Sequence, residues 1–400
     1  MAAIRFGLIG MGRHGMRYAQ HLMRDVEGAE LYAVCRQDQL RGSAFAREHN
    51  VRYYREYLDL LGDPKVDAVA VVTPPRLHER ICTTALSAGK AVLVEKPMAC
   101  TTREAINIVE ATSRSGCLLM VAHTMRFNSV VQALEAHIDE IGAIHTISMS
   151  QRLEPPEHDW LDDFAQAGGG ATLNTGIHLF DLLRYLSGDE VRHVYCEMAR
   201  ILYEELDDSC VATMGLRHSK IHCVLDVARY AGGRSGRIEL VGETGQLMGD
   251  FEHGYAMIIR GRRATPLDLS PPVQTIVSGL KAFVQALRHD EEPPISAVDG
   301  YRAVEIAEAC YESASAKEPV EIESDDDDDD TPDDWDEYRA VCGPLPQTCP
   351  CLRVSFPVDS PQRERGKYAL SRCCVSCAVV MFYREWNNPC VCRTDRGCHT

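Results

Sequence analysis

The sequence predicts an N-terminal α/β domain with a doubly wound parallel sheet, followed by a C-terminal α+β domain with a mostly antiparallel sheet. Its 400 residues are enough for two domains with buried cores. Short apolar runs alternate with helical patterns over residues 1–122, and successive strands replace this alternation over residues 123–324. Residues 325–400 differ in composition and form a third expected segment.

The N-terminal domain is predicted from apolar, β-branched runs that are expected to be strands. These runs span residues 4–9, 30–35, 68–72, 91–94 and 117–121, and helical patterns lie between them at 13–24, 39–48, 76–88 and 102–115. Strands that are apolar at every position are typical of a parallel sheet with both faces covered. Thr101, with Glu104 three residues later, indicates the start of the last of these helices.

The C-terminal domain is predicted from a different order of elements. Helices are expected at 129–140, 174–186, 273–288 and 298–316, and strands at 143–152, 191–200, 209–217, 220–227, 236–241 and 255–260. Successive strands joined by short turns favour antiparallel pairing. The last helix is expected to pack back on the N-terminal domain.

The C-terminal tail is predicted to be disordered. Residues 325–337 hold ten acidic residues in thirteen positions, a composition that repels itself. Nine of the 17 cysteines lie between Cys342 and Cys398, where only Cys374 and Cys377 have the spacing of a zinc knuckle. No matching second pair follows, so we expect an unstructured appendage and no metal, with zinc binding as the alternative.

Composition excludes several classes of protein. A formal net charge of −17 argues against a nucleic-acid partner. No apolar run reaches the ~20 residues that a membrane-spanning helix needs, and the first residues lack the pattern of a signal peptide. We therefore expect a cytoplasmic protein without a membrane partner. The eight cysteines before the tail lie mostly in apolar patterns, which predicts buried, reduced thiols.

A glycine-rich motif stands between the expected strand 4–9 and the expected helix 13–24. Glycines in this context let the chain turn tightly and approach a pyrophosphate at the helix N-terminus. A glycine-rich turn without a ligand is the alternative, but the strand before and the helix after favour a dinucleotide site. Its expected contacts are Gly10, Met11, Gly12, Arg13, His14 and Gly15.

The residues after strand 30–35 bear on the choice of nicotinamide cofactor. An acid that holds the ribose of NAD is expected there, but the chain has Arg36, with Arg41 nearby. An arginine at this place can pair with a 2′-phosphate and stack on adenine. The sequence therefore favours NADP. The alternative is NAD, with Asp38 holding the ribose and Arg36 in solvent.

Polar segments follow strands 68–72 and 91–94, at the carboxyl ends where open α/β sheets bind ligands. Lys96 is one of only seven lysines among 42 basic residues, and it precedes a proline whose peptide bond can be cis. The alternative is a lysine in a surface turn. The expected cofactor contacts at these strand ends are Thr73, Pro74, His78, Glu95, Lys96 and Pro97.

A third motif runs from Gly168-Gly169-Gly170 through Asn174 and His178 to Asp181. The glycines permit close approach of the backbone to a ligand, and residues three or four apart are neighbours on a helix. Histidine titrates near neutrality and commonly accepts the proton of an alcohol. The alternative for His178 is a packed core residue.

Together, the Glu95-Lys96-Pro97 segment, the stretch from Gly168 to His178 and the closing helix 301–316 resemble the Gfo/Idh/MocA family, named after glucose–fructose oxidoreductase, inositol dehydrogenase and a rhizopine-catabolism protein. The similarity extends from Ile4 to about Ile322. It implies a Rossmann domain and a C-terminal domain whose open sheet commonly forms homo-oligomers. It also implies hydride transfer between nicotinamide and a carbon of a sugar, a cyclitol or a related compound.

The resemblance implies that Lys96 contacts the reacting oxygen and that His178 exchanges its proton. Asn174 stands where the familiar pattern has an aspartate, and an amide cannot ionise, so the usual proton relay is in doubt. Asp181 is a candidate for the missing carboxylate, with a structural contact as the alternative. Arg126 and Trp160 are candidates for the substrate pocket, and each has a structural role as its alternative.

The expected activity is therefore that of an NAD(P)-dependent dehydrogenase or reductase acting on CH–OH groups of a small polyol, sugar or cyclitol. Two other classes stay open. One is a glycosidase that oxidises its sugar transiently with nicotinamide. The other is a non-catalytic, nucleotide-sensing protein, which Asn174 favours.

Overall fold

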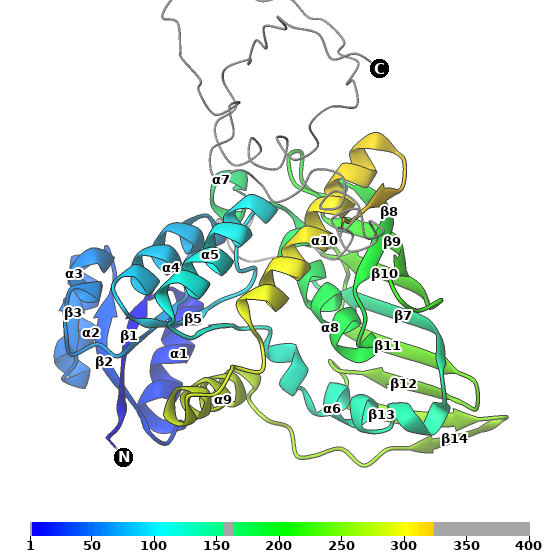
Figure 1. Cartoon of the computed structure of the whole chain (residues 1–400), viewed down its shortest axis with the longest axis horizontal. Helices are drawn as coiled ribbons and strands as arrows, with labels where there is room; N and C mark the ends of the chain where they lie inside the picture. Colours follow the sequence, from blue (N-terminus) through cyan, green and yellow to red (C-terminus); the bar gives the residue numbers. More distant parts are fainter. Residues whose placement is uncertain (1, 156–162, 324–400) are drawn as a thin grey trace, which may run out of the picture. The chain divides into compact units, whose positions relative to one another are not determined.

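The first sheet of the computed structural model, which describes residues 2–155 and 163–323, has six parallel strands in the order β3-β2-β1-β4-β5-β6 (Figure 1). The strands are β1 (Ile4–Ile9), β2 (Ala29–Cys35), β3 (Arg52–Tyr54), β4 (Ala68–Val71), β5 (Ala91–Val94) and β6 (Leu119–Val121). The direction of winding reverses between β1 and β4, and ligands bind at the carboxyl ends of strands beside such a reversal. This is the predicted Rossmann arrangement.

Five helices connect these strands and cover the sheet (Figure 1). They are α1 (Arg13–Arg24), α2 (Gln39–His49), α3 (Tyr57–Leu61), α4 (His78–Ser87) and α5 (Thr102–Ser115). All residues of β4 and β5 are buried, which explains their continuously apolar sequence. The Thr101 side chain accepts a hydrogen bond from the Glu104 amide and caps α5, as predicted. The short elements β3 and α3 were not predicted.

The second sheet has nine strands in the order β14-β13-β12-β11-β7-β10-β9-β8-β15 (Figure 1). They are β7 (Ile144–Arg152), β8 (Val191–Ala199), β9 (Ser209–Leu216), β10 (His222–Ala228), β11 (Ser235–Gly242), β12 (Gln246–Asp250), β13 (Tyr255–Arg260), β14 (Arg263–Pro266) and β15 (Val320–Glu321). Only β7 and β10 pair in parallel, so the prediction of a mostly antiparallel sheet is confirmed for the described strands. The strands β12, β14 and β15 were not predicted.

The helices of the C-terminal domain lie against the second sheet and against the first domain (Figure 1). They are α6 (Ser129–Ala136), α7 (Phe164–Ala167), α8 (Ile177–Ser187), α9 (Thr275–His289) and α10 (Ala297–Ala316). Helix α10 contacts α8 and β8, and it also contacts α5 and β6. Both sheets belong to one compact unit.

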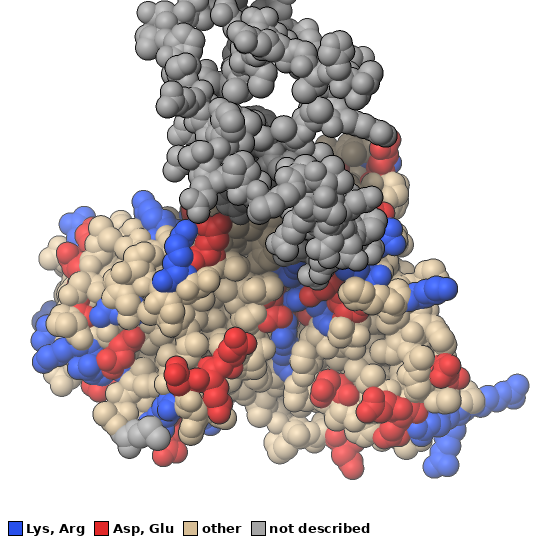
Figure 2. Space-filling view, viewed as in Figure 1, with Lys and Arg blue, Asp and Glu red and all other residues tan. Residues whose placement is uncertain are grey.

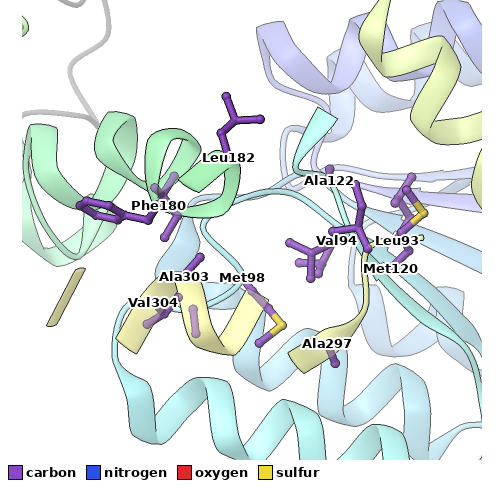
Figure 3. Close-up of a cluster of buried hydrophobic side chains, with 14 of the residues drawn as sticks. Leu93, Val94, Met98, Met120, Ala122, Phe180, Leu182, Ala297, Ala303 and Val304 are labelled. Atoms are coloured by element: carbon purple, nitrogen blue, oxygen red, sulfur yellow. The ribbon is translucent and has the colours of Figure 1, made fainter. Parts of the chain in front are cut away.

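A shared hydrophobic cluster joins the two domains (Figure 3). Phe180 of α8 and Ala303 of α10 lie on one side of this cluster, and Val94 of β5 and Met120 of β6 lie on the other. All four side chains are fully buried. Burial of apolar surface therefore holds α8, the helix that carries His178, against the first sheet through α10.

Charged side chains are spread over the surface, and most of the cysteines in the described residues are buried. Acidic and basic side chains are interspersed over both domains on the face shown in Figure 2. The eight cysteines of the described residues are free, and six are buried, including Cys35 and Cys82, whereas Cys100 and Cys117 are partly exposed. None of the helices in residues 2–155 and 163–323 is both long and apolar enough to cross a membrane. The predictions for Trp160 and for the tail 325–400 lie outside the described residues.

Candidate active site

A cavity of about 940 Å³ opens at the carboxyl ends of β1, β4 and β5. Its size is at the upper end for small-molecule sites, which suits a cofactor arm together with a substrate. The first domain lines it with the glycine turn after β1 and with the segments after β4 and β5. The second domain lines it with Asn174 and His178 and with the ends of sheet strands. The structure thus brings Lys96 and His178 into one cavity.

The glycine turn has the geometry that a pyrophosphate requires. Gly10 has a φ of 100°, and a Cβ there would overlap the carbonyl oxygen of Val72. No atom lies within 4 Å of a Cβ built on Gly12. Gly12 is the N-cap residue of α1, and the helix start has no side-chain capping hydrogen bond. The first amides of α1 therefore border an open space, which fits an anionic group at the helix N-terminus.

Some predicted cofactor contacts line the cavity and others support it from outside. Gly10, Gly12, Arg13, His14, Gly15, Thr73, Pro74, Glu95 and Lys96 line it. Met11 is buried, and its carbonyl oxygen accepts a hydrogen bond of 2.6 Å from Arg36 Nη1. Arg41 and Asp38 form an ion pair of 3.5 Å at the start of α2, where Asp38 also caps the helix.

The contacts of His78, which was expected to contact the cofactor, favour a structural role. The side chain is fully buried. Its Nδ1 lies 2.9 Å from the carbonyl oxygen of Pro97, and its Nε2 lies 2.8 Å from that of Thr73. The imidazole thereby ties the segment after β4 to the segment after β5. Burial lowers the pKa of His78 despite these two carbonyl contacts.

Glu95 is ionised and tied to the glycine turn. His14 Nε2 lies 2.7 Å from Glu95 Oε1, and the Tyr18 hydroxyl donates to the same oxygen at 2.6 Å. Burial alone would raise the pKa of Glu95, but the hydrogen bond and charge of His14, the charge of Lys96 and the hydroxyl of Tyr18 lower it to about 2. Glu95 therefore supplies a fixed negative charge beside Lys96.

Lys96 reaches from the first domain to the second. Its peptide bond to Pro97 is cis, as anticipated. The Nζ atom donates a hydrogen bond of 3.0 Å to the backbone carbonyl oxygen of Asn174. Burial lowers the pKa of Lys96, the charge of Arg229 lowers it further, and Glu95 opposes both effects. The ammonium group thus lies in the cavity with its direction fixed by the carbonyl of Asn174.

His178 is held as a neutral imidazole. It lines the cavity at the start of α8, and its Nδ1 is buried without a hydrogen-bond partner among the described residues. Burial lowers its pKa well below the ordinary value of 6.5, and repulsion from the Lys96 ammonium adds to this effect. A neutral imidazole next to an ammonium group can accept a proton from a hydroxyl that the ammonium contacts.

The glycine-rich stretch before His178 forms a π-helical turn over Thr172–Gly176. Such turns change the helical hydrogen-bond pattern and are frequent at functional sites. Asn174 Nδ2 donates to the carbonyl oxygen of Gly169 at 2.6 Å and to those of Ala167 and Gly170 at 3.3 Å each. The Asn174 amide is therefore committed to the backbone of its own turn.

Asp207, which was not predicted from the sequence, fixes this turn. Its carboxylate accepts hydrogen bonds from the amides of Gly170 and Thr172 at 3.1 and 2.7 Å. It also accepts hydrogen bonds from the hydroxyls of Thr172 and Tyr311 at 2.6 and 2.8 Å. Asp207 is 6% exposed. It lies 33 positions from Asn174 in the chain, and no local pattern indicates the contact.

Arg126 and Asp181 are paired with each other, which favours the structural alternative for both residues. Arg126 Nε lies 3.1 and 3.0 Å from the two carboxylate oxygens of Asp181, and Nη2 donates to Oδ1 at 2.6 Å. Nη2 also donates to Asp299 at 2.9 Å, at the start of α10. Asp181 is fully buried, and neither residue is among those that line the cavity. The pair is a structural ion pair that connects α8 to the segment after β6.

Other cavity residues were not predicted at all. Among them are Gln151, Arg229, Arg234 and Glu252, which lie near strand ends or in turns of the second sheet. Their positions depend on how the strands pair, so no local sequence motif indicates them. These residues give the second domain its own polar wall in the cavity.

Two family models match the chain. Residues 4–123 match the oxidoreductase family with an NAD-binding Rossmann fold, and residues 131–248 match the GFO/IDH/MocA C-terminal domain. Among curated proteins, the myo-inositol 2-dehydrogenase of Thermotoga maritima is 27% identical over 337 residues, which cover 80% of this chain and 99% of that protein. The 1,5-anhydro-D-fructose reductase of Ensifer adhaerens is also 27% identical, over 80% of this chain and 99% of its own.

Solved structures show the same fold. A probable dehydrogenase from Thermotoga maritima superposes with a TM-score of 0.69 at 27% identity, over 79% of this chain and 98% of that chain. A levoglucosan dehydrogenase in complex with NADH and levoglucosan superposes with a TM-score of 0.73 at 22% identity, over 80% and 100%. At this identity the second comparison bears on the fold alone.

Proposed function

The chain belongs to the Gfo/Idh/MocA family of oxidoreductases, and from this premise we propose that it is an NAD(P)-dependent dehydrogenase or reductase acting on a secondary alcohol or the matching ketone. The substrate is a sugar, a cyclitol or a related small molecule. One observation carries the proposal: Lys96 of the first domain and His178 of the second line one cavity beside the glycine turn. The names of the inositol dehydrogenase and anhydrofructose reductase relatives support the substrate class.

The described residues fit a nicotinamide dinucleotide. The open space at Gly12 and the uncapped start of α1 suit the pyrophosphate. The buried Thr73 Oγ1, which has no partner among the residues described, is a further polar group at the same strand ends. When bound, the cofactor supplies the acceptor or donor of the hydride.

The side chains of this site have separate roles in proton transfer and charge stabilisation. Neutral His178 accepts the hydroxyl proton of the alcohol, and the Lys96 ammonium stabilises the negative charge that develops on the oxygen. Glu95 keeps Lys96 charged, because it opposes the effect of burial on the pKa of Lys96. Asn174 orients Lys96 through its backbone carbonyl, so this step needs no carboxylate at position 174.

Two variants test the assignment. Lys96→Met and His178→Ala are each expected to lower kcat by about 10²–10⁴-fold on a polyol or sugar that the wild-type protein oxidises. NAD(P)H affinity and thermal stability should change little in His178→Ala, since His178 is assigned to the proton and not to the cofactor. Full turnover in either variant removes that residue from the mechanism. Failure of the wild type to bind any nicotinamide dinucleotide overturns the proposal as a whole.

Arg36 supports NADP as the preferred cofactor, with NAD as the alternative. It follows β2 directly, and its guanidinium lies against the glycine turn through the carbonyl of Met11. A guanidinium at this end of β2 can pair with a 2′-phosphate. Asp38 is the candidate for binding the ribose of NAD. Its side chain accepts a hydrogen bond of 3.0 Å from the Arg41 amide and caps α2.

Three further expectations remain proposals. We place the domain boundary at residue 122, directly after β6 closes the first sheet. A homo-oligomer formed through the second sheet is supported by the exposed side chains of Tyr195, Val211 and Val224 on β8, β9 and β10. The cytoplasmic location stays a prediction from the sequence.

A further inference from the structure

His123 is a fully buried histidine whose ring forms no hydrogen bond within the described part of the chain. Both of its ring nitrogens lack a partner there. A neutral imidazole has one donor and one acceptor, and leaving both unbonded in the interior costs free energy. His78 is equally buried, yet each of its nitrogens lies within hydrogen-bond distance of a backbone carbonyl oxygen. A polar partner for the His123 ring is therefore expected.

His123 lies behind the wall of the cavity. It follows Ala122 after the end of β6 and precedes the short helix Thr124–Phe127. Its two chain neighbours, Ala122 and Thr124, line the cavity, whereas the His123 side chain is buried beneath them. The short helix packs against α8. His123 is thus held at the junction between the first sheet and the helix that carries His178.

The charged groups that act on the His123 ring come from both domains. The carboxylates of Asp181 on α8 and Asp299 on α10 favour its protonated form. The positive charges of Arg126 and Lys96 oppose that form, and burial opposes it most strongly. The pKa of His123 is therefore lowered from its ordinary value. A neutral ring of this kind can accept a hydrogen bond, which a protonated ring cannot do.

His178 has the complementary requirement. It lines the cavity, and its Nδ1 is the ring nitrogen that is buried without a partner among the described residues. Nε2 is thus the nitrogen that meets a substrate hydroxyl. A neutral imidazole can accept a proton at Nε2 only when its own proton is on Nδ1. The Nδ1–H group then needs an acceptor behind the cavity wall.

His123 is the group placed to meet this requirement. Its charge state acts on His178, so the two rings lie within electrostatic reach of each other. The side-chain amide of Asn174 is committed to three backbone carbonyls, and the carboxylate of Asp181 binds Arg126. Buried groups without a protein partner commonly share a water molecule, which bridges polar atoms too far apart for a direct hydrogen bond.

We propose that His123 is a positioning residue that keeps the proton of His178 on Nδ1 through one bridging water molecule. The inference rests on the proposed function of His178 as the base and extends it to a residue that does not contact the substrate. His178 Nδ1–H donates to the water oxygen, and the water donates to a ring nitrogen of His123. The proton on the other His123 nitrogen is favoured by the negative charges of Asp181 and Asp299.

The tautomer of His178 tests the proposal without turnover. In full-length protein with isotope-labelled histidine, nuclear magnetic resonance shows which ring nitrogen carries the proton, and the spectrum of His178→Ala assigns the signals. We expect the wild type to carry the proton of His178 on Nδ1, and His123→Leu to move a measurable share of it to Nε2. A proton on Nε2 in the wild type, or the same tautomer in both proteins, overturns the proposal.

Kinetics measure the consequence for the reaction. His123→Leu should lower kcat by about ten- to hundred-fold, as is usual for loss of a group that orients a reacting side chain. KM and NADPH affinity should change little, because His123 lies behind the wall. His123→Gln keeps a donor and an acceptor, so it should recover part of the loss and guards against a folding defect. A His123→Gln variant no more active than His123→Leu contradicts the hydrogen-bonding role.

His21→Leu is the matched control. His21 is also buried, but it lies in the last turn of α1, where its Nδ1 is 2.6 Å from Asp25. This variant removes a buried imidazole away from the cavity, so kcat and the tautomer of His178 should stay as in the wild type. Equal losses of kcat in His21→Leu and His123→Leu overturn the assignment.

The role of His123 and the proposed function fail separately. Full turnover in His178→Ala refutes the proposed function, whichever nitrogen of His178 carries the proton. A tautomer and a kcat that do not depend on His123, together with loss of turnover in His178→Ala, support the oxidoreductase and refute the role of His123.

Discussion

The Arg126 guanidinium holds both carboxylate oxygens of Asp181 at distances between 2.6 and 3.1 Å, in a place where neither side chain reaches the cavity. Arg126 belongs to the segment after β6, and Asp181 lies on α8 three residues after His178. Asp299 of α10 accepts a further bond from Arg126. The pair thus fixes α8 to the point where the chain passes from the first domain to the second.

Asp181→Asn should destabilise the protein by about 3 kcal/mol, because it leaves the Arg126 charge buried with only part of its compensation. Urea unfolding measures the loss. The matched control is Asp67→Asn, which breaks an exposed ion pair with Arg5 and should cost about 1 kcal/mol or less. A loss at Asp181 no larger than that at Asp67 contradicts the structural role of the buried pair.

The pH profile of alcohol oxidation should be flat on its acidic side down to below pH 6.5, the ordinary pKa of histidine. His178 has to be neutral to accept a proton. Burial and the charge of Lys96 lower its pKa, so it stays neutral as the pH falls through that value. The dependence of kcat/KM on pH measures this. Activity that declines with an apparent pKa at or above 6.5 would show that His178 is not the base or is not depressed.

Asn174→Asp should not restore a stronger proton relay and should destabilise the protein by about 1–3 kcal/mol. The amide donates to three backbone carbonyls, and a carboxylate there would face these oxygens without a proton to give. The new carboxyl group should therefore have a raised pKa in the folded state. Its ionisation opposes folding, so the deficit should grow as the pH rises through that pKa. Unfolding at mildly acidic and mildly alkaline pH checks the sign, and a stabilised variant contradicts the contacts.

Gly12→Ala and Gly10→Ala should separate cofactor binding from folding. A Cβ at Gly12 meets no atom within 4 Å, so the free protein should keep its melting temperature while NADPH affinity falls at least about ten-fold. Gly10 has a φ of 100°, so alanine there should cost about 1–3 kcal/mol of stability. Melting curves without cofactor and titration of NADPH fluorescence give both quantities. Unchanged affinity in Gly12→Ala would mean that the pyrophosphate binds elsewhere.

Arg36→Asp should reverse the cofactor preference. We expect NADPH affinity to fall by about ten- to hundred-fold and NADH affinity to stay the same or rise, because the charge that faces the 2′-phosphate changes sign. Arg24→Gln is the control, since Arg24 is exposed at the C-terminal end of α1. Parallel losses for both dinucleotides in Arg36→Asp would favour NAD as the natural cofactor.

Much of the fold could be predicted because buried parallel strands leave a plain signal. The strands 4–9 and 91–94 have the predicted limits, since nearly all their residues are buried and apolar. Strand β14, by contrast, is exposed at every position, and β15 has two residues. Such edge strands carry no hydrophobic pattern and form only when a neighbouring strand offers its hydrogen bonds.

Site residues could be predicted where they belong to a local sequence motif, but not where their position depends on how strands or side chains pair. Lys96 and His178 stand in recognisable motifs, and the structure brings both to the cavity. Helical spacing placed Asp181 near His178, but spacing does not tell which face of α8 meets Arg126. Arg229 enters the cavity because β10 pairs with β7, and that pairing joins residues 76 positions apart.

Helix α10 also has a consequence for how the protein is made. Its first turn supplies Asp299, which bonds to Arg126, and its apolar side packs on β6 and α8. During translation, Lys96 and His178 therefore leave the ribosome well before α10, the helix that stabilises their positions. The nascent chain can close its first sheet early, but its catalytic pair gains a fixed geometry only near the end of translation of the described domains.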